Sequence, residues 1–414
     1  MNPPADKADS STPTSRNPTL DVFRGYAVAG MIAVNFLGGY ACTPRIFKHT
    51  NDYCSYADTI MPHFLFAVGF AIAVVGRRFD PTQPAQVRAL QWKLARRCLA
   101  LMAFAFVLYF PWTTANLLEK VSTPGFWFAV WKRDWMQTLT HIAWTTLWML
   151  PCIAWPWRWR WMWLTISVLA HATLSEWWYF HWVHASPSGI DGGPLGFLTW
   201  SIPAWTGWWA GDWYLHRMPP PSDSIQQHTT SLRRRWLLVA AALMVIGYGA
   251  SCLTRRYDRD PEVPSAKTKL ADSPVLGRPL PEGAIAPSSW RERFAEPPFV
   301  PPPASTHRAW NYWQMSQRAG TLSYLVFASG FSLLVFALVE AIVGRLGIGF
   351  GILNALGRNA LVCYAAHGYA IQWLGQWLTK EAPAWQVALG LLTLELAMIG
   401  LAMLLHARRI YIRM

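Results

Sequence analysis

The residues best suited to acid–base chemistry lie close together near the N-terminus. Asn35 lies near the end of a hydrophobic stretch, His49 follows in a polar loop, and Asp58 opens the next hydrophobic stretch. A histidine accepts a proton from an attacking nucleophile near neutral pH, and a carboxylate or amide beside it fixes its tautomer and stabilises its charged form. His49 is therefore the strongest candidate for a general base, although spacing alone favours a structural histidine equally.

Other ionisable and amide side chains lie within later hydrophobic stretches. Each is costly in lipid unless it is paired or solvated, so each is a candidate functional group. A single histidine on a helix more often bonds a neighbouring helix than catalyses a reaction, so we expect that role for His141 and His171. We expect His63, at the entrance of a hydrophobic stretch, to face lipid headgroups.

The composition indicates that these groups are positioned by membrane helices. Hydrophobic residues make up 53% of the 414 residues, and only 14% are charged, against about 25% in a soluble domain. We predict an all-α integral membrane protein with about ten transmembrane helices in one bundle, each near the roughly 20 residues that cross a bilayer. The predicted segments are 22–41, 58–76, 98–118, 136–154, 161–178, 194–215, 236–252, 319–343, 353–376 and 385–405.

The distribution of Lys and Arg predicts the orientation, because positive charge is retained on the cytoplasmic side of a membrane. Most basic residues fall in one set of alternate loops, which includes both termini. The long segment after residue 252 is left out, because long loops cross largely regardless of charge. The opposite set holds Arg45, Lys48, Lys120, Lys132, Arg133 and Lys380. We therefore expect both termini in the cytoplasm, and the candidate groups Asn35, His49, Asp58, Asn359 and His367 towards the outer face.

This topology divides the chain into four parts. Residues 1–19 are predicted to form a disordered cytoplasmic tail, and 20–252 the first seven helices with the His49 loop. Residues 253–318 form a Pro-rich extracytoplasmic loop, and 319–414 the last three helices. The loop is poor in aliphatic residues, so it is either a lid over the membrane domain or a mobile spacer. The sequence favours neither.

The net charge of +14 does not indicate nucleic-acid binding, because the basic residues are dispersed over several loops. Anionic lipid accounts for most of them, and the alternative for some is an anionic cofactor. Arg96-Arg97 and Arg233-Arg234-Arg235 are the best candidates for phosphate contacts. The six cysteines show no metal-binding spacing, so no metal is expected, and Cys42 and Cys54 form either a disulfide or two free thiols.

Several stretches match a known family pattern. They are Leu20-Asp21-Val22-Phe23-Arg24-Gly25, Val34-Asn35-Phe36, Phe47-Lys48-His49, Ala57-Asp58-Thr59-Ile60-Met61-Pro62, Asp191-Gly192-Gly193-Pro194-Leu195-Gly196 and Leu356-Gly357-Arg358-Asn359-Ala360-Leu361 with Tyr364 and His367. Together they resemble conserved blocks of heparan-α-glucosaminide N-acetyltransferase and its bacterial relatives. The match spans nearly all of the membrane region and misses residues 252–318. The loop between His49 and Asp58 is one residue shorter than is usual in that family.

The resemblance implies a transmembrane acyltransferase, in a bacterial inner membrane and as a possible homodimer. Such an enzyme takes acetyl-CoA from the cytoplasm and delivers the acetyl group to an extracytoplasmic sugar or glycan. His49 matches the family's essential histidine, and Asn35 and Asp58 match polar residues that border the site. Asn359 and His367 match a later helix, where either is placed to polarise the thioester carbonyl.

The acyl donor is polyanionic, so its nucleotide is expected at basic residues on the cytoplasmic side. The candidates are Arg24, Arg96, Arg97, Arg233, Arg234, Arg235 and Arg358. Two other classes of function fit the same composition: a transporter or flippase for a polar substrate, which a pseudo-repeat would favour, and a catalytically silent scaffold of a membrane complex. The sequence shows no such repeat.

Overall fold

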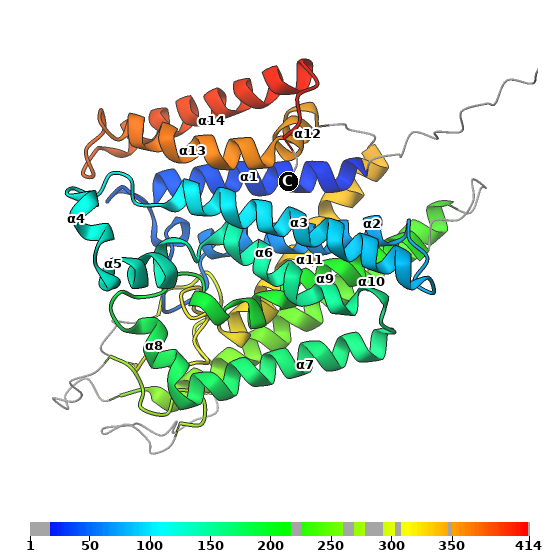
Figure 1. Cartoon of the computed structure of the whole chain (residues 1–414), viewed down its shortest axis with the longest axis horizontal. Helices are drawn as coiled ribbons and strands as arrows, with labels where there is room; N and C mark the ends of the chain where they lie inside the picture. The colour runs from blue at the N-terminus through cyan, green and yellow to red at the C-terminus, as the bar shows by residue number, and fades with distance from the viewer. Residues whose placement is uncertain are drawn as a thin grey trace, which may run out of the picture.

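The computed structural model describes residues 17–216, 225–259, 269–277, 293–302, 308–346 and 350–412. Within these ranges the regular structure is helical, and β-pairing is confined to two isolated bridges. The longer helices run side by side as one bundle (Figure 1). The all-α prediction is thus confirmed for the described residues. Most of the predicted N-terminal tail, residues 1–16, lies outside them.

The helices follow one another in the order of the predicted hydrophobic segments. The longer ones are α1 (Pro18–Leu37), α2 (Ile60–Gly76), α3 (Pro84–Tyr109), α6 (Thr138–Met149), α7 (Trp157–Leu174), α9 (Phe197–His216), α10 (Ile225–Ser251), α11 (Leu322–Leu346), α12 (Gly351–Arg358), α13 (Ala360–Leu374) and α14 (Ala384–Ala407). Three short helices lie at one end of the bundle: α4 (Leu117–Val121), α5 (Pro124–Ala129) and α8 (Phe180–His184).

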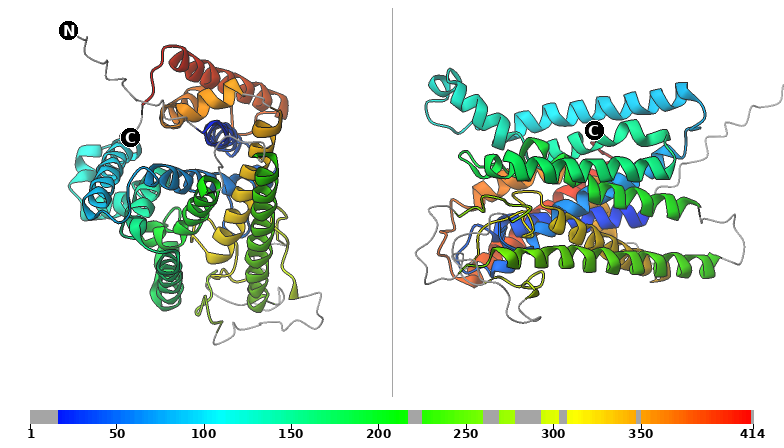
Figure 2. Two further views of the ribbon diagram at one scale, coloured as in Figure 1. Left: turned by 90° about the vertical axis from the view of Figure 1, so that its right-hand side faces the viewer. Right: turned by 90° about the horizontal axis from the view of Figure 1, so that it is seen from below.

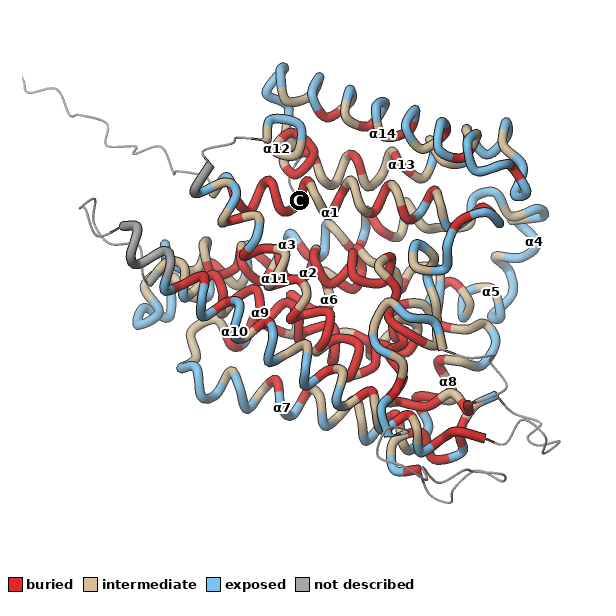
Figure 3. Tube along the Cα trace, turned by 180° about the vertical axis from the view of Figure 1, so that it is seen from behind, coloured by how far each residue is buried: buried red, intermediate tan, exposed pale blue. Residues whose placement is uncertain are grey.

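Five helical spans among the described residues are long and apolar enough to cross a membrane. They are Pro18–Leu37, Ala57–Gly76, Ser231–Tyr257, Leu322–Gly344 and Ala384–Ala407. Figure 3 shows buried residues concentrated in the central helices, whereas α7 and α14 at the periphery are largely exposed. Large apolar side chains on the exposed face of α14 include Leu389, Leu392 and Leu396. A continuous apolar face of this kind suits contact with lipid rather than water, and indicates a helical membrane protein.

Two predicted segments differ from the helices observed. α3 begins at Pro84, well before the predicted 98, because its polar first half continues the same helix and proline is favoured in the first turn. The predicted segment 353–376 is divided at Asn359, where the backbone leaves the helical region with φ −112° and ψ 25°. The Asn359 amide donates to the carbonyls of Ala355 and Ala402, so the break leaves fewer carbonyls unpaired.

Two glycines allow α1 and α12 to cross at close range. A Cβ atom on Gly357 would lie 1.8 Å from the carbonyl oxygen of Asp21, and one on Gly25 would lie 1.8 Å from that of Leu353. Only glycine fits at such a distance. The crossing brings the start of α1 against the end of α12, so charged residues from two distant stretches of sequence become neighbours.

The described parts of the long segment after α10 pack on the end of the bundle that carries α8 (Figure 2). Glu176 accepts hydrogen bonds from the Ser273 hydroxyl and the Val275 N–H, at 2.5 and 2.7 Å. The Phe299 N–H donates to the carbonyl of Cys54 at 2.9 Å. The Phe299 contact joins the segment to the loop that contains His49, and the Glu176 contacts join it to the end of α7.

Candidate active site

His49 and Asp58 form a hydrogen-bonded pair beside the start of α2. The His49 Nδ1 atom lies 3.0 Å from the Asp58 Oδ1 atom. Asp58 is fully buried in a 3₁₀ turn, Ala57–Thr59, and its Oδ2 atom accepts from the Ser55 N–H at 3.0 Å and the Ser55 hydroxyl at 2.8 Å. The carboxylate is therefore fixed on one side and bonds the imidazole with the other.

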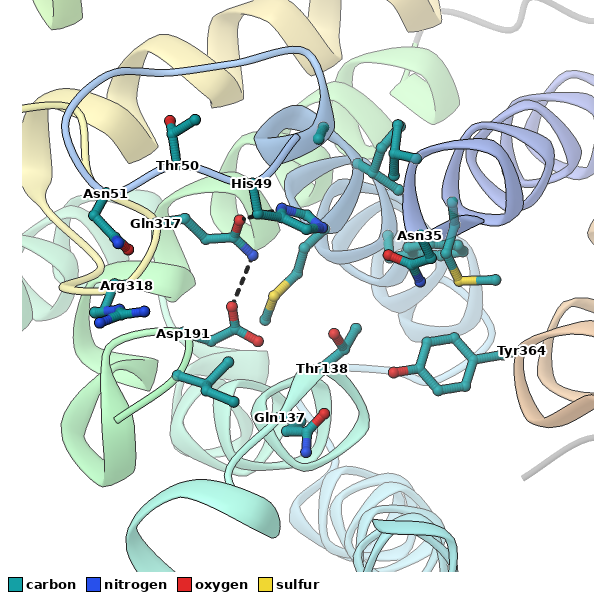
Figure 4. A pocket seen from close by; sticks show the side chains of 17 residues that line it. Asn35, His49, Thr50, Asn51, Gln137, Thr138, Asp191, Gln317, Arg318 and Tyr364 are labelled. Carbon is teal, nitrogen blue, oxygen red and sulfur yellow. Dashed lines mark hydrogen bonds between the residues drawn. The ribbon is translucent and has the colours of Figure 1, made fainter. Parts of the chain in front are cut away.

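The tautomer of His49 follows from a second partner. Its Nδ1 atom also lies 2.9 Å from the Gln317 Oε1 atom, while the Gln317 Nε2 atom donates to Asp191 Oδ1 at 2.8 Å (Figure 4). The amide nitrogen must face the carboxylate, which fixes the orientation of the Gln317 amide. Both partners of Nδ1 are then acceptors, so Nδ1 carries the proton. The Nε2 atom of the neutral ring is left with a lone pair that accepts a proton.

His49 of this pair lines a cavity of about 350 Å³ (Figure 4). One wall is apolar and is formed by residues of α1 and α2, among them Met31, Ile60 and Phe64. The polar wall combines segments that are far apart in sequence, with Asn35, His49, Thr138, Asp191, Gln317 and Tyr364 as its main members. About half of the His49 side chain is exposed, 47% by accessible area. An imidazole that lines a cavity of this size is able to reach a bound substrate.

Two titratable groups of the cavity have shifted pKa values. Burial lowers the pKa of His49, but the hydrogen bonds to Asp58 and Gln317 and the negative charges of Asp58 and Asp191 together outweigh this effect, so the pKa lies above the usual 6.5. Burial raises the pKa of Asp191 to about 6, against the opposing effects of the Gln317 hydrogen bond and the His49 charge. Shifted pKa values of this kind cluster at functional sites.

A second cavity, of about 330 Å³, adjoins the first. Residues of α2, α3 and α6 supply its apolar walls, and Arg24, Arg97 and Arg358 supply positive charge. Arg24 and Arg358 both lie close to the Asp21 carboxylate, at 3.7 and 3.5 Å. Phe64, Thr138 and Tyr364 line both cavities. The two cavities therefore meet at these three residues, with the three arginines in one and His49 in the other.

Asn35 and His367 are brought together, but only Asn35 faces the first cavity. The Asn35 Nδ2 atom lies 3.0 Å from the His367 Nε2 atom, and His367 Nδ1 bonds the carbonyl oxygen of Tyr364. Neutral His367 has one ring N–H, which donates to the Tyr364 carbonyl, so its other ring nitrogen accepts a hydrogen bond from the Asn35 amide. Asn359 is fully buried at the break between α12 and α13. Neither His367 nor Asn359 is among the residues that line the cavity, so they support its walls.

The seven predicted arginines separate into two groups. Arg24, Arg97 and Arg358 line the second cavity, as described. Arg96 lies over the Trp92 ring instead, because consecutive residues on a helix point about 100° apart. Arg233 forms an ion pair with Glu340 between α10 and α11, and Arg234 and Arg235 are exposed on α10. None of these four is among the residues that line either cavity.

Two other histidines bond protein groups away from the cavity. His63 is fully buried, and its Nδ1 atom lies 2.7 Å from the Ser332 hydroxyl on α11. The expectation that it faces headgroups is wrong, because α2 turns this side towards α11. His171 lies 2.9 Å from the Tyr312 hydroxyl, which agrees with a structural contact. Cys42 and Cys54 are free thiols, as are the other four cysteines.

Sequence reasoning did not assign roles to Asp191, Gln317 or Tyr364. Asp191 begins a turn in which three consecutive residues have positive φ, at 52°, 80° and 60°. The Gly192-Gly193 pair after an aspartate was a local signal for such a turn. The Gly192 N–H donates to the Arg318 carbonyl at 2.8 Å, which joins the turn to the segment that carries Gln317. Gln317 itself is 268 residues from His49, and no sequence pattern links them.

Comparison with known proteins assigns no family. No protein-family model matches the chain, and none of the curated proteins compared matches it. Within the described residues, no group of three or more His, Cys, Asp or Glu side chains is arranged to hold a metal ion. The functional interpretation therefore depends on the geometry of the two adjoining cavities.

Proposed function

We propose that this protein is a transmembrane acyltransferase. It moves an acyl group, acetyl in the simplest case, from cytoplasmic acyl-CoA to an amine or hydroxyl of an extracytoplasmic sugar or glycan. In this proposal ten segments cross a bacterial inner membrane and both termini are cytoplasmic. The proposal rests on one observation, that two cavities adjoin each other. Three arginines line one of them, and His49, which is paired with the buried Asp58 carboxylate, lines the other.

The second cavity has the chemistry needed to bind the acyl donor. Coenzyme A combines phosphate groups with a long, narrow and largely uncharged arm. Guanidinium groups are the preferred partners of phosphate, and Arg24, Arg97 and Arg358 line this cavity, Arg24 and Arg358 beside Asp21 near the start of α1. The arm then fits between the apolar faces of α2, α3 and α6. The thioester arrives at the wall shared by the two cavities, formed by Phe64, Thr138 and Tyr364.

His49 supplies the proton transfers of the reaction. Its Nε2 atom takes the proton of the acceptor N–H or O–H group as the acceptor lone pair forms a bond to the thioester carbonyl carbon. The C–S bond then breaks, and the imidazolium returns the proton to the departing sulfur, so that coenzyme A leaves as a thiol. Asp58 stabilises the imidazolium between these two steps, and its own bonds to Ser55 keep the pair in place.

The proposal is tested with the full chain reconstituted in proteoliposomes. Acetyl-CoA is expected to raise the melting temperature, because a ligand that binds only the folded state stabilises it. Addition of an amino sugar, or of a sugar that offers only hydroxyl groups, is expected to release free thiol from acetyl-CoA. Stabilisation without thiol release for any acceptor, together with movement of an unmodified polar solute across the bilayer, would instead favour a transporter. Absence of any acetyl-CoA effect would refute the proposal.

We call the second cavity, where the acyl donor is proposed to bind, the donor cavity. Removing a single charge from it is expected to weaken binding of the acyl donor selectively. Arg97→Gln should raise the KM for acetyl-CoA about tenfold, the effect of one charge-assisted contact with phosphate, and leave kcat within about twofold. The matched control is Arg96→Gln, which removes the same charge from the neighbouring residue outside the cavity. Equal KM values in the two variants would show that Arg97 does not contact the donor.

The pH dependence of transfer should report the His49 pKa. As a base, His49 acts in its neutral form, so kcat/KM is expected to fall as the pH falls through the raised pKa, which lies above 6.5. The activity is therefore present on the alkaline side of this pKa and lost on the acidic side. The measurement is kcat/KM for the acceptor between pH 5 and 9. A profile that stays flat down to pH 5 would exclude His49 as the base.

A further inference from the structure

The reaction needs a hydrogen-bond donor at the thioester carbonyl, and neither His367 nor Asn359, the two residues expected to polarise it, supplies one. His367 uses its ring N–H on the Tyr364 backbone, and Asn359 bonds two backbone carbonyls at the helix break. The carbonyl oxygen gains negative charge in the transition state, where a fixed donor contributes most to the rate. The hydrogen-bond donor must therefore lie on the wall shared by the first and second cavities.

Tyr364 has its phenol at this position. It is one of three residues that line both cavities, and the other two are Phe64 and Thr138. Figure 4 shows its hydroxyl directed into the cavity beside Thr138, on the opposite side from the loop that carries His49. A thioester held between the two would have the base on one side and the phenol on the other.

The hydrogen bonds of Tyr109 determine which of the two phenols, that of Tyr109 or that of Tyr364, can donate a hydrogen bond into the cavity. The Tyr109 oxygen accepts the Leu139 N–H at 3.3 Å and lies 2.5 Å from the Tyr364 oxygen. The Tyr109 hydroxyl proton needs an acceptor, and among the described residues the Tyr364 oxygen is its hydrogen-bonding neighbour. Tyr109 thus donates, and the Tyr364 proton remains directed to the cavity side. Thr138 lies beside this phenol and lines both cavities with it.

We propose that Tyr364 donates a hydrogen bond from its phenol to the thioester carbonyl oxygen and stabilises the oxyanion formed during transfer. This inference rests on the proposed acyltransferase function and assigns that site its electrophilic residue. When the acceptor attacks, the carbonyl electron pair moves to the oxygen, and it returns when the C–S bond breaks. The phenol keeps its proton throughout, so the proton transfers belong to His49 alone. Tyr109 is a positioning residue that orients the phenol.

The test uses Tyr364→Phe, which removes the hydroxyl and keeps the ring. We expect kcat to fall about 100-fold, as for the loss of one oxyanion donor, with the KM for acetyl-CoA nearly unchanged. The matched control is Tyr369→Phe, on the same helix but 63% exposed and outside both cavities, which should leave kcat unchanged. Tyr109→Phe should lower kcat by a smaller factor, because the phenol of Tyr364 keeps its proton but loses its orientation.

A spectroscopic measurement separates this role from a structural one. The probe is a ketone analogue of acetyl-CoA in which a methylene group replaces the sulfur. Its carbonyl stretch should move to lower frequency on binding to the full-length protein, and Tyr364→Phe should abolish this shift. If Tyr364→Phe lost activity but kept the carbonyl shift of the wild type, the proposal would be overturned. It would also be overturned if the shift survived Tyr364→Phe but was lost in Asn35→Ala, since Asn35 has a second amide hydrogen.

The outcomes also separate this inference from the proposed function. Normal thiol release by the wild type together with normal kcat in Tyr364→Phe would overturn the role of Tyr364 and leave the acyltransferase standing. A wild-type protein that neither binds the ketone analogue nor releases thiol would overturn both.

Discussion

Replacement of His49 by alanine is expected to lower kcat for acyl transfer about 1,000-fold, within the range for loss of a general base. In the proposed mechanism its Nε2 atom accepts the proton, because Asp58 and Gln317 together hold the ring proton on Nδ1. Donor binding should persist, because His49 does not line the donor cavity. Thiol release and thermal stabilisation by acetyl-CoA measure the two effects separately.

The control for His49→Ala is His181→Ala, which removes an imidazole from α8 at the same end of the bundle. That variant should keep the activity of the wild type. The melting temperature should change little in His49→Ala, because about half of the side chain is exposed and its loss creates no buried cavity. Normal turnover in His49→Ala would refute both the assignment of the base and the mechanism built on it.

The second large effect is expected for Asp58→Asn, with a fall in kcat of about 100-fold to 10,000-fold. The Oδ2 position accepts the Ser55 N–H and hydroxyl, so the amide oxygen of the new side chain must take that place. Its NH₂ group is then turned towards His49 Nδ1 and donates to it. The imidazole proton then moves to Nε2. In the proposed mechanism this atom accepts the proton of the acceptor, and it can no longer do so when it already carries one.

The matched control is Asp52→Asn, which removes a carboxylate from the same loop. Asp52 lies 3.6 Å from Arg45 and is not among the residues that line the first cavity, so kcat should be nearly unchanged. Because Asp58→Asn changes one heavy atom, the protein should fold and bind acetyl-CoA as before. A fall in activity that followed a loss of thermal stability, or no fall at all, would contradict the predicted reversal of the tautomer.

The sequence by itself determined the helices and the pair at the centre of the site. Hydrophobicity is a property of contiguous residues, so each predicted segment coincides largely with helix in the structure. His49 and Asp58 are nine residues apart, and a loop that short keeps them within reach of each other. Residue types and local spacing made His49 the strongest candidate among the histidines but favoured a structural role equally, and the family resemblance indicated the base.

The sequence also identified basic residues suited to phosphate but not which of them share a cavity. Arg96 and Arg97 are indistinguishable by sequence, because the rotation of α3 about its axis decides which one faces α2 and α6. That rotation is set by side-chain packing. Arg233 matched the pattern equally well, but its partner Glu340 lies 107 residues away on α11. A pair at such a separation depends on which helices become neighbours.

Only the tertiary structure decided how the cavity around His49 is completed. Gln317 reaches His49 across 268 residues, Asp191 reaches Gln317 across 126, and Tyr109 reaches Tyr364 across 255. Local propensities carry no information about contacts at these separations, because the packing of whole helices creates them all at once. The His49–Asp58 pair could therefore be predicted from the chain alone, whereas the tautomer of His49, the nearby Asp191 carboxylate and the Tyr364 phenol on the opposite wall follow from the way the bundle packs.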